Sequence, residues 1–438
     1  MKNSLLILFT IICFSVSSQS IEIKGKITDK TTGKGISYVS IRLKNVYLGT
    51  AANKDGVFTF KVSKKQLHDS LIFSCVGYKK IILPIEKITQ ENIIQMERQP
   101  IELTEVIVQS SSVSAENILR KAIQKIPENY HTNTTIGTFY YRDWRTYNDT
   151  LYVFAEGIFD VLRIIGYGKI DSSYLKAKPG SIKEIKTKNE SAKKRNSYHI
   201  VQKNRLLVFN EDIITKNNES KNGIKLSDVY SNLSFDPLMR PEKTIKLLNQ
   251  TNYTYSMSSY YNEEGVLFYV VERKIKPGKY IDEFKDPTIT RYTINADDYA
   301  IVNITKLYGK FDREQNTITV SLLPKILVLY SNSNAKYSSL QYEKINDKYT
   351  LVSRVSTEDY EVVYFKKKRF TLKGVSIQHL ITFNDTDTNS FQKKFAIDPQ
   401  KRKFSDVFTN NTSDDAFWEQ YNYIPLEESI KKKIKTNF

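Results

Sequence analysis

The sequence predicts a mainly β protein, in which a small seven-stranded β-sandwich precedes a larger α+β region with a curved antiparallel sheet. Apolar and polar residues alternate along much of the chain between short turn sequences, which is typical of half-buried strands. Aromatic residues make up 12% of the 438 residues, led by 29 Tyr and 22 Phe, and these residues favour strands. Residues 114–126 instead have helical spacing, which places one helix between the two β regions.

The N-terminus predicts export. Lys2 precedes the apolar run 5–12, and small and polar residues follow as far as Ser20, which is the order found in a secretory signal peptide. We expect residues 1–18 to be this signal, with cleavage before Gln19. Cys13 does not fit lipoprotein processing, because Ile12 stands where a small side chain is needed. No later stretch approaches the ~20 apolar residues of a membrane helix, so no transmembrane span is expected. These features predict a location in the periplasm or at the outer-membrane periphery.

Composition limits the partners and the redox chemistry. After signal removal Cys75 is the remaining cysteine, so an internal disulfide is excluded. The formal net charge is +18, with lysine clusters at 193–195, 366–369, 401–403 and 431–433. Such clusters can cover solvated faces or contact lipopolysaccharide or phospholipid headgroups. Nucleic acid is not expected as a partner, because no nucleic-acid-binding module is recognisable.

The region after the signal reads as short strands. Ile21, Ile23 and Ile27 share one face of the first strand, and strands are expected at 38–43 and 57–62. The turn 53–56 has Asn, Asp and Gly, which tolerate positive φ. Residues 71–76 are nearly all apolar, as in a central strand buried on both faces.

Four segments of this region, at 25–29, 35–41, 49–58 and 73–78, resemble the carboxypeptidase regulatory-like domain. The resemblance implies a transthyretin-like sandwich over residues 19–99 and no catalytic residues in it. Its structural motif positions here are Gly25, Gly49, Asn53, Asp55, Gly56, Phe58, Gly77 and Tyr78. Gly49 and Gly56 are expected in turns that a Cβ would strain. The Asp-Gly ending does not predict a calcium loop, because Ala51 stands where an acidic ligand is needed.

Residues 100–113 are predicted to be a linker. Its segment 103–108 resembles the connection between this domain and the plug of TonB-dependent receptors, yet the chain beyond it lacks the regular ten-residue strands of a receptor barrel. Residues 114–438 are predicted to form one β-rich domain, whose helix is capped by Ser114 and ends near Pro127. Strands are expected at 136–142, 151–157, 251–260, 266–275, 290–295 and 300–308.

The two ends of this domain, at 118–142 and 415–426, resemble uncharacterised envelope proteins that carry the same N-terminal domain. That resemblance implies no activity. The sheet is also reminiscent of curved-sheet lipoprotein carriers of the periplasm, an analogy at the level of the fold. Such a sheet could hold an acyl chain or a peptide against its tyrosines, or the tyrosines could pack on a helix.

The search for chemistry predicts no enzyme, no cofactor and no metal. The histidines, His68, His131, His199 and His379, lack metal-site spacing, and no Gly-x-Ser-x-Gly or phosphate-binding loop occurs. The densest polar and aromatic cluster is 142–145, and we predict a ligand surface at Tyr140, Arg142 and Trp144.

We therefore expect a non-catalytic binding or scaffolding module of the cell envelope, with an envelope protein, a polysaccharide or a lipid surface as partner. The alternatives are a periplasmic carrier or chaperone for a lipid or peptide, and a hydrolase with a site near Arg142. A hydrolase needs acid, base and nucleophile side chains that converge in one cleft.

Overall fold

The chain divides into two compact units, and each is described by itself. The computed structural model describes residues 20–88, 91–99, 114–163, 197–209, 236–239, 248, 251–276, 288–308, 318–323, 326–330, 336–364, 368–385, 418 and 421–436. The first unit comprises Met1–Ser74, Lys80–Met96 and Asp414–Pro425. The second comprises Cys75–Lys79, Glu97–Ser413 and Leu426–Phe438. The predicted signal peptide and linker lie outside the described residues.

The described part of the first unit holds the predicted seven strands in two sheets. They are β1 (Ser20–Asp29), β2 (Ser40–Leu43), β3 (Gly49–Ala51), β4 (Val57–Ser63), β5 (Ser70–Ser74), β6 (Ile81–Pro84) and β7 (Glu91–Met96). One sheet has the order β4-β1-β7, with β1 and β7 parallel, and the other has the order β3-β2-β5-β6. Two short 3-10 helices, η1 (Lys64–Gln66) and η2 (Ile85–Lys87), follow β4 and β6.

The core of this unit lies between its two sheets. Phe58 of β4 and Phe73 of β5 are fully buried and meet edge to face, with ring centroids 5.6 Å apart. Leu71 and Phe73 are 0% exposed and Ile72 is 6% exposed, so the central position predicted for this strand is confirmed. The strand ends at Ser74, and Cys75 lies just beyond it. Burial raises the pKa of the Cys75 thiol to about 12, which keeps it protonated at neutral pH.

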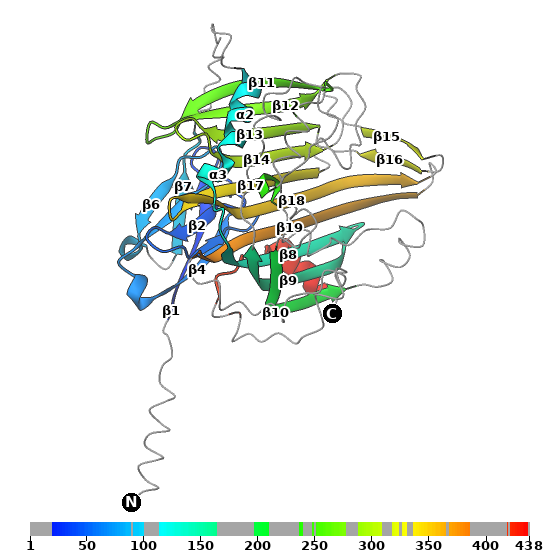
Figure 1. Cartoon of the computed structure of the whole chain (residues 1–438). Helices are drawn as coiled ribbons and strands as arrows, with labels where there is room; N and C mark the ends of the chain where they lie inside the picture. Colours follow the sequence, from blue (N-terminus) through cyan, green and yellow to red (C-terminus); the bar gives the residue numbers. More distant parts are fainter. Residues whose placement is uncertain are drawn as a thin grey trace, which may run out of the picture. The chain divides into compact units, whose positions relative to one another are not determined.

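The second unit contains a large curved antiparallel sheet (Figure 1). Within the described ranges its main path runs β10-β9-β8-β19-β18-β17-β14-β13-β12-β11, and β16 joins at β18 with β15 beside it. The strands are β8 (Thr135–Tyr147), β9 (Thr150–Arg163), β10 (Ser197–Phe209), β11 (Tyr253–Tyr261), β12 (Leu267–Ile275), β13 (Ile289–Asn295), β14 (Ile301–Tyr308), β15 (Ile318–Leu323), β16 (Ile326–Tyr330), β17 (Lys336–Ile345), β18 (Lys348–Tyr364) and β19 (Lys368–Asn384). The predicted strands of this region are confirmed, and several extend beyond the predicted bounds.

The predicted helix is α2 (Ala115–Gln124), followed by the short α3 (Ile126–Asn129). Ser114 caps it as expected, because its Oγ accepts a hydrogen bond from the Asn117 amide at 3.1 Å. The apolar side of α2 contacts β11, β12 and β13 (Figure 1). Its buried residues share a core with buried residues of β12, β13, β14, β17 and β18.

The two faces of the sheet are distinguished by strand register. Leu340 belongs to the core under α2, and it lies opposite Arg354, which lies opposite Gln378, which lies opposite Tyr141. Opposite residues of neighbouring strands share a face, so these side chains lie on the side that we call the α2 face. The other side carries Leu151 and Phe154, which pack with Ile430 of α10 (Glu428–Thr436), and we call it the α10 face.

Candidate functional site

The polar cluster 142–145 is split by the pleat of β8. Asp143 and Arg145 lie on the α2 face, whereas Arg142 and Trp144 lie on the α10 face. A site that uses all four side chains together is therefore absent from this strand. The two halves have to be considered separately.

On the α10 face, Arg142 is the centre of a buried ionic group. Its Nε donates to Glu156 Oε2 at 3.0 Å, its Nη2 lies 3.0 Å from the same oxygen, and its Nη1 lies 3.7 Å from Glu427 Oε2. Tyr140 also donates its hydroxyl to Glu156. Burial disfavours the charged form of Arg142, but Tyr140, Glu156 and Glu427 outweigh burial and raise the pKa of the guanidinium.

The predicted ligand surface at Tyr140, Arg142 and Trp144 is wrong for its first two residues. Tyr140 is 1% exposed and Arg142 is 0% exposed, and both use their polar groups within the chain. Trp144 is partly buried beside the Leu151, Phe154 and Ile430 cluster. The prediction failed because the carboxylates that draw Arg142 into the interior come from β9 and from the C-terminal segment.

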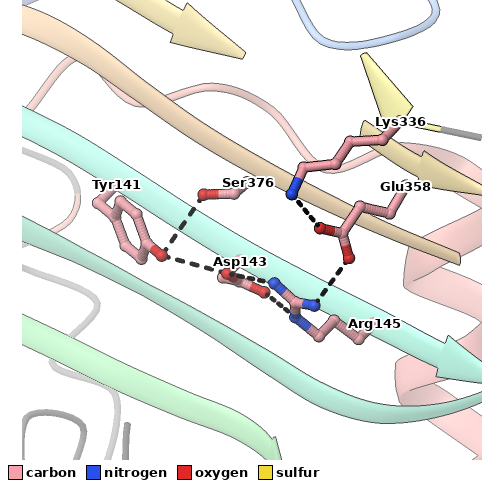
Figure 2. Close-up of polar contacts among 6 residues, drawn as sticks. All are labelled: Tyr141, Asp143, Arg145, Lys336, Glu358 and Ser376. Atoms are coloured by element: carbon pink, nitrogen blue, oxygen red, sulfur yellow. Dashed lines mark hydrogen bonds and ion pairs between the residues drawn. The ribbon is translucent and has the colours of Figure 1, made fainter. Parts of the chain in front are cut away.

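On the α2 face, Asp143 and Arg145 belong to a polar network that Figure 2 shows. Arg145 Nε donates to Asp143 Oδ1 at 3.1 Å, and the Tyr141 hydroxyl donates to Asp143 Oδ2 at 3.1 Å. Ser376 of β19 donates from Oγ to the Tyr141 hydroxyl at 3.4 Å. Asp143 is 0% exposed, so this end of the network is buried.

The network continues across β19 to β18 and β17. Arg145 Nη1 donates to Glu358 Oε2 at 3.1 Å, and Lys336 Nζ lies 3.5 Å from Glu358 Oε1. Arg145 can reach Glu358 because Gly374 is the residue between them in register. A Cβ at Gly374 would lie 3.3 Å from Arg145 Cγ, so a side chain there would press on the arginine.

The charges of the network alternate in sign and become more exposed toward Lys336. The side chains of Arg145, Glu358 and Lys336 are 14%, 22% and 38% exposed. Burial alone would raise the pKa of Glu358, but Arg145 and Lys336 outweigh burial and hold it below its ordinary value. For Arg145, burial is outweighed by Asp143 and Glu358, which raise the pKa of the guanidinium. Arg145 and Glu358 therefore stay charged at neutral pH.

Both carboxylates of the network are paired with cations. Asp143 and Glu358 are each held by a cation, so neither carboxylate is placed as a free general base. Within the described ranges, no group of three or more His, Cys, Asp and Glu side chains could hold a metal ion. His68 bonds to Glu86, His131 lies near Asp385 and His379 is buried in β19. The side chain of His199 lies outside the described residues.

Sequence reasoning singled out Asp143 and Arg145 but missed Glu358, which pairs with Arg145, and Lys336 and Ser376, which bond to Glu358 and Tyr141. Glu358 is 213 residues away from Arg145 in the sequence. The partners lie in ordinary alternating strands, and no local pattern separates them from other polar strand residues.

The motif positions of the first unit act in its turns and core. Asn53 Oδ1 accepts from the amides of Asp55 at 3.0 Å and Val57 at 2.9 Å. Gly56 has φ +81°, and a Cβ there would lie 2.3 Å from the Ile27 carbonyl oxygen. A Cβ at Gly25 would meet the Phe58 ring at 2.7 Å.

Three other motif positions lie at the edges of these elements. Gly49 begins β3 and is not among the described glycines with positive φ, so its predicted turn role is wrong. Gly77 has φ +82°, and Tyr78 forms an isolated β-bridge with Arg98. The Asn53 side chain accepts hydrogen bonds within its own turn, which indicates a structural role for the turn 53–56.

The first unit can be compared with known families at this point. Residues 23–108 match the family model of the CarboxypepD_reg-like domain. The N-terminal sandwich is a carboxypeptidase regulatory-like domain. The predicted resemblance is thereby confirmed for this part of the chain. No protein with a curated description matches the chain.

Similarity to solved structures is faint. A lipovitellin structure determined for its lipid–protein interactions has a TM-score of 0.22 and 8% identity, and the match covers 59% of this chain and 26% of that one. The chain thus spans about a quarter of the lipovitellin chain. A protein of unknown function from Bacteroides fragilis NCTC 9343 has a TM-score of 0.14 and 10% identity, with 83% of this chain and 98% of that chain covered. Scores this low carry no argument about the fold or function of the region beyond the regulatory-like domain.

Proposed function

We propose that this chain is an exported, non-catalytic binding or scaffolding module of the cell envelope, and that it holds a polysaccharide on the α2 face of its large sheet. The observation that carries the proposal is the polar network of Tyr141, Asp143, Arg145, Lys336, Glu358 and Ser376. It links charges of alternating sign and two hydroxyl groups across four neighbouring strands; Tyr141 and Asp143 are buried, and the network is partly exposed at Glu358 and Lys336.

The register beside the charged residues favours a hydroxyl-rich ligand. Ser338, Ser356 and Ser376 lie opposite one another on β17, β18 and β19, and Asp143 continues the row on β8. A second row, of Lys336, Glu358, Gly374 and Arg145, runs alongside, two residues away from the first row on each strand. Strand geometry puts ~7 Å between the two rows. Sugar hydroxyls both donate and accept hydrogen bonds, so they can match carboxylates, ammonium groups and serine hydroxyls together.

The envelope location rests on the N-terminal sequence pattern. No helix in the described part is long and apolar enough to cross a membrane. Expression in a Gram-negative host, cell fractionation and N-terminal sequencing test this part of the proposal. We expect the mature chain in the periplasmic or outer-membrane fraction with its N-terminus near Gln19, and a cytosolic chain that retains Met1 contradicts export.

The ligand is tested by calorimetric titration of the purified mature chain with soluble fragments of envelope polysaccharide. Glu358→Gln and Lys336→Met should weaken binding by about tenfold each, since each removes a charge-assisted hydrogen bond to the ligand. Glu272→Gln is the control, because Glu272 pairs with Arg291 on the opposite face of the sheet. Equal binding by all three variants contradicts a site at the network.

The hydrolase alternative gains no support from the Arg142 group, whose members are buried and paired with one another.

A further inference from the structure

Three basic side chains lie around Ser338 on the α2 face, next to the polar network. Lys306 of β14 lies directly opposite Ser338 of β17. Lys336 lies two residues before Ser338 on the same strand, and Arg354 lies two residues from the position opposite Ser338 on β18. Side chains at such diagonal positions have Cβ atoms ~7–8 Å apart, a distance that lysine and arginine can span. All three cations are partly exposed.

These cations lie at the margin of the apolar core that α2 covers. In this part of the sheet the core includes Ile304 and Leu340, which lie opposite each other. Lys306 and Ser338 are the next opposite pair on the same face, two positions away along each strand. Arg354 lies opposite Leu340, at the border itself. The three cations are therefore placed where the cover of α2 ends.

Arg273 of β12 belongs to the same row but is enclosed. It lies opposite Thr290, which lies opposite Lys306. It is 1% exposed, its Nη2 donates to Thr290 Oγ1 at 3.1 Å, and its guanidinium carbon lies 4.2 Å from the centroid of the Tyr253 ring. Its burial separates it from the partly exposed cations on β14, β17 and β18.

Positive charge exceeds negative charge in this part of the α2 face. Three rows run from β14 to β8 through Lys336, Ser338 and Arg354. Their described side chains include four cations and two carboxylates, namely Lys306, Lys336, Arg354 and Arg145 against Glu358 and Asp143. A ligand that brings additional negative charge is therefore matched better here than a neutral one.

The setting of Arg354 supports the same conclusion. Burial lowers the pKa of its guanidinium, and Tyr141, Tyr308 and Asp143 oppose burial only in part. For Arg145, by contrast, Asp143 and Glu358 outweigh burial. An additional anion beside Arg354 would favour its charged form.

We propose that the polysaccharide on the α2 face is acidic, and that Lys306, Lys336 and Arg354 bind the carboxylate or phosphate groups that it carries. This inference rests on the proposed function and names the chemical class of its ligand. Ammonium and guanidinium groups form charge-assisted hydrogen bonds with either anion. Tyr308, which lies opposite Lys336 and under its Nζ at 5.2 Å from the ring centroid, adds a partly exposed ring and hydroxyl beside the cations.

The test compares acidic saccharides with neutral forms of the same backbone by calorimetric titration of the purified mature chain. The pairs are oligogalacturonate with its methyl ester, and a phosphorylated maltooligosaccharide with the unmodified one. We expect at least one acid to bind more tightly than its neutral form by about tenfold, and added salt to reduce the difference. A preference within the first pair identifies a carboxylate as the anion, and one within the second pair identifies a phosphate.

The outcomes separate this inference from the function on which it rests. Equal binding of each acid and its neutral form overturns the acidic ligand and leaves a polysaccharide site in place. Absence of binding by all four saccharides contradicts the polysaccharide site itself and the inference with it.

Lys306→Met should lower the preference for the acid by about threefold or more, while the affinity for the neutral form stays the same. Lys274→Met is the matched control, because it removes the same charge at an exposed position on the opposite face of the sheet. The proposal is overturned by a Lys306 variant that keeps the full preference, or by one that loses affinity for both forms equally. An equal loss of preference in the Lys274 variant shows a general effect of net charge and overturns it as well.

Discussion

Three buried or nearly buried arginines on one sheet differ in how their charge is matched. Arg142 contacts Glu156 and Glu427, Arg145 contacts Asp143 and Glu358, and Arg273 has a hydroxyl and a tyrosine ring. A buried ion pair seldom adds net stability compared with apolar side chains, but the loss of one partner leaves a buried charge unmatched. The consequence of each substitution therefore depends on what the removed arginine leaves behind.

Arg142→Met should be strongly destabilising, because Glu156 and Glu427 would remain buried without their cation. We expect the free energy of unfolding to fall by about 3–5 kcal/mol, measured by urea denaturation. Arg291→Met is the control, since that arginine is 46% exposed and pairs with Glu272 at the surface, where a loss below about 1 kcal/mol is expected. Similar losses in the two variants would contradict the buried role of Arg142.

His379 should make the protein sensitive to acid. The ring is 1% exposed, neither nitrogen has a hydrogen-bond partner among the described residues, and burial lowers its pKa from 6.5 to about 3. Between these pH values the unfolded chain binds a proton that the folded chain does not, so the free energy of unfolding falls as the pH falls through this window. Stability from the neutral ring is fully present above pH 6.5.

His379→Gln should reduce this loss, because glutamine has no proton to gain in the same range. Urea unfolding at about pH 7 and about pH 4.5 measures the effect. His68→Gln is the control, since that side chain is 88% exposed. Unchanged acid sensitivity in the His379 variant argues against the buried neutral ring.

At the scale of elements, β19 joins the two parts of the polar network. It lies between β8, which carries Asp143 and Arg145, and β18, which carries Glu358. Gly374 leaves the surface of β19 open for the Arg145 side chain to cross. A glycine normally weakens a strand interior, and its presence here is explained by the close approach of this arginine.

Gly374→Val should prevent the Arg145 side chain from passing over β19 to reach Glu358. The added atoms would press on Arg145, and we expect a loss of about 1–3 kcal/mol in the free energy of unfolding, with a smaller loss for Gly374→Ala. The pKa of Glu358 should rise in the valine variant, because Arg145 helps to hold it low. Urea denaturation and NMR titration of the carboxyl group measure the two effects. A valine variant in which the pKa of Glu358 is unchanged is inconsistent with the crossing.

At the scale of the whole molecule, a segment near the C-terminus belongs to the same compact unit as the N-terminal strands. Residues 414–425 belong to the first unit together with β1–β7, and the chain enters the second unit at Leu426. Asn422 is 4% exposed; its side-chain amide oxygen accepts from the Lys61 amide at 2.6 Å, and its nitrogen donates to the Lys61 carbonyl at 3.1 Å. Lys61 lies on β4, an edge strand, so this residue satisfies backbone groups that would otherwise be unpaired.

Asn422→Ala should therefore destabilise the regulatory-like domain, although 361 residues separate it from Lys61. We expect a loss of about 1–3 kcal/mol and faster hydrogen exchange at the Lys61 amide. Asn92→Ala is the control, because Asn92 makes an exposed hydrogen bond to the Lys24 carbonyl on the same sheet. Equal exchange at Lys61 in the wild type and the Asn422 variant speaks against this role.

The sequence by itself determined the local structure. Alternation of apolar residues predicted the sandwich strands and six of the twelve strands described in the large sheet, and Ser114 with the apolar spacing after it predicted α2. These features depend on residues two to four positions apart, whose side chains share a face of a strand or helix. The pattern at 25–78 was also sufficient to recognise the regulatory-like domain.

Only the tertiary structure decided which polar residues meet. Arg142 and Arg145 look alike in the sequence, yet one is buried against Glu156 and the other crosses to Glu358. Their environments depend on strand order and register, and a shift of one residue would exchange the two faces. Such long-range pairing leaves no mark within a single strand, which explains why the partners of the polar network and the setting of Arg273 became visible only in the folded chain.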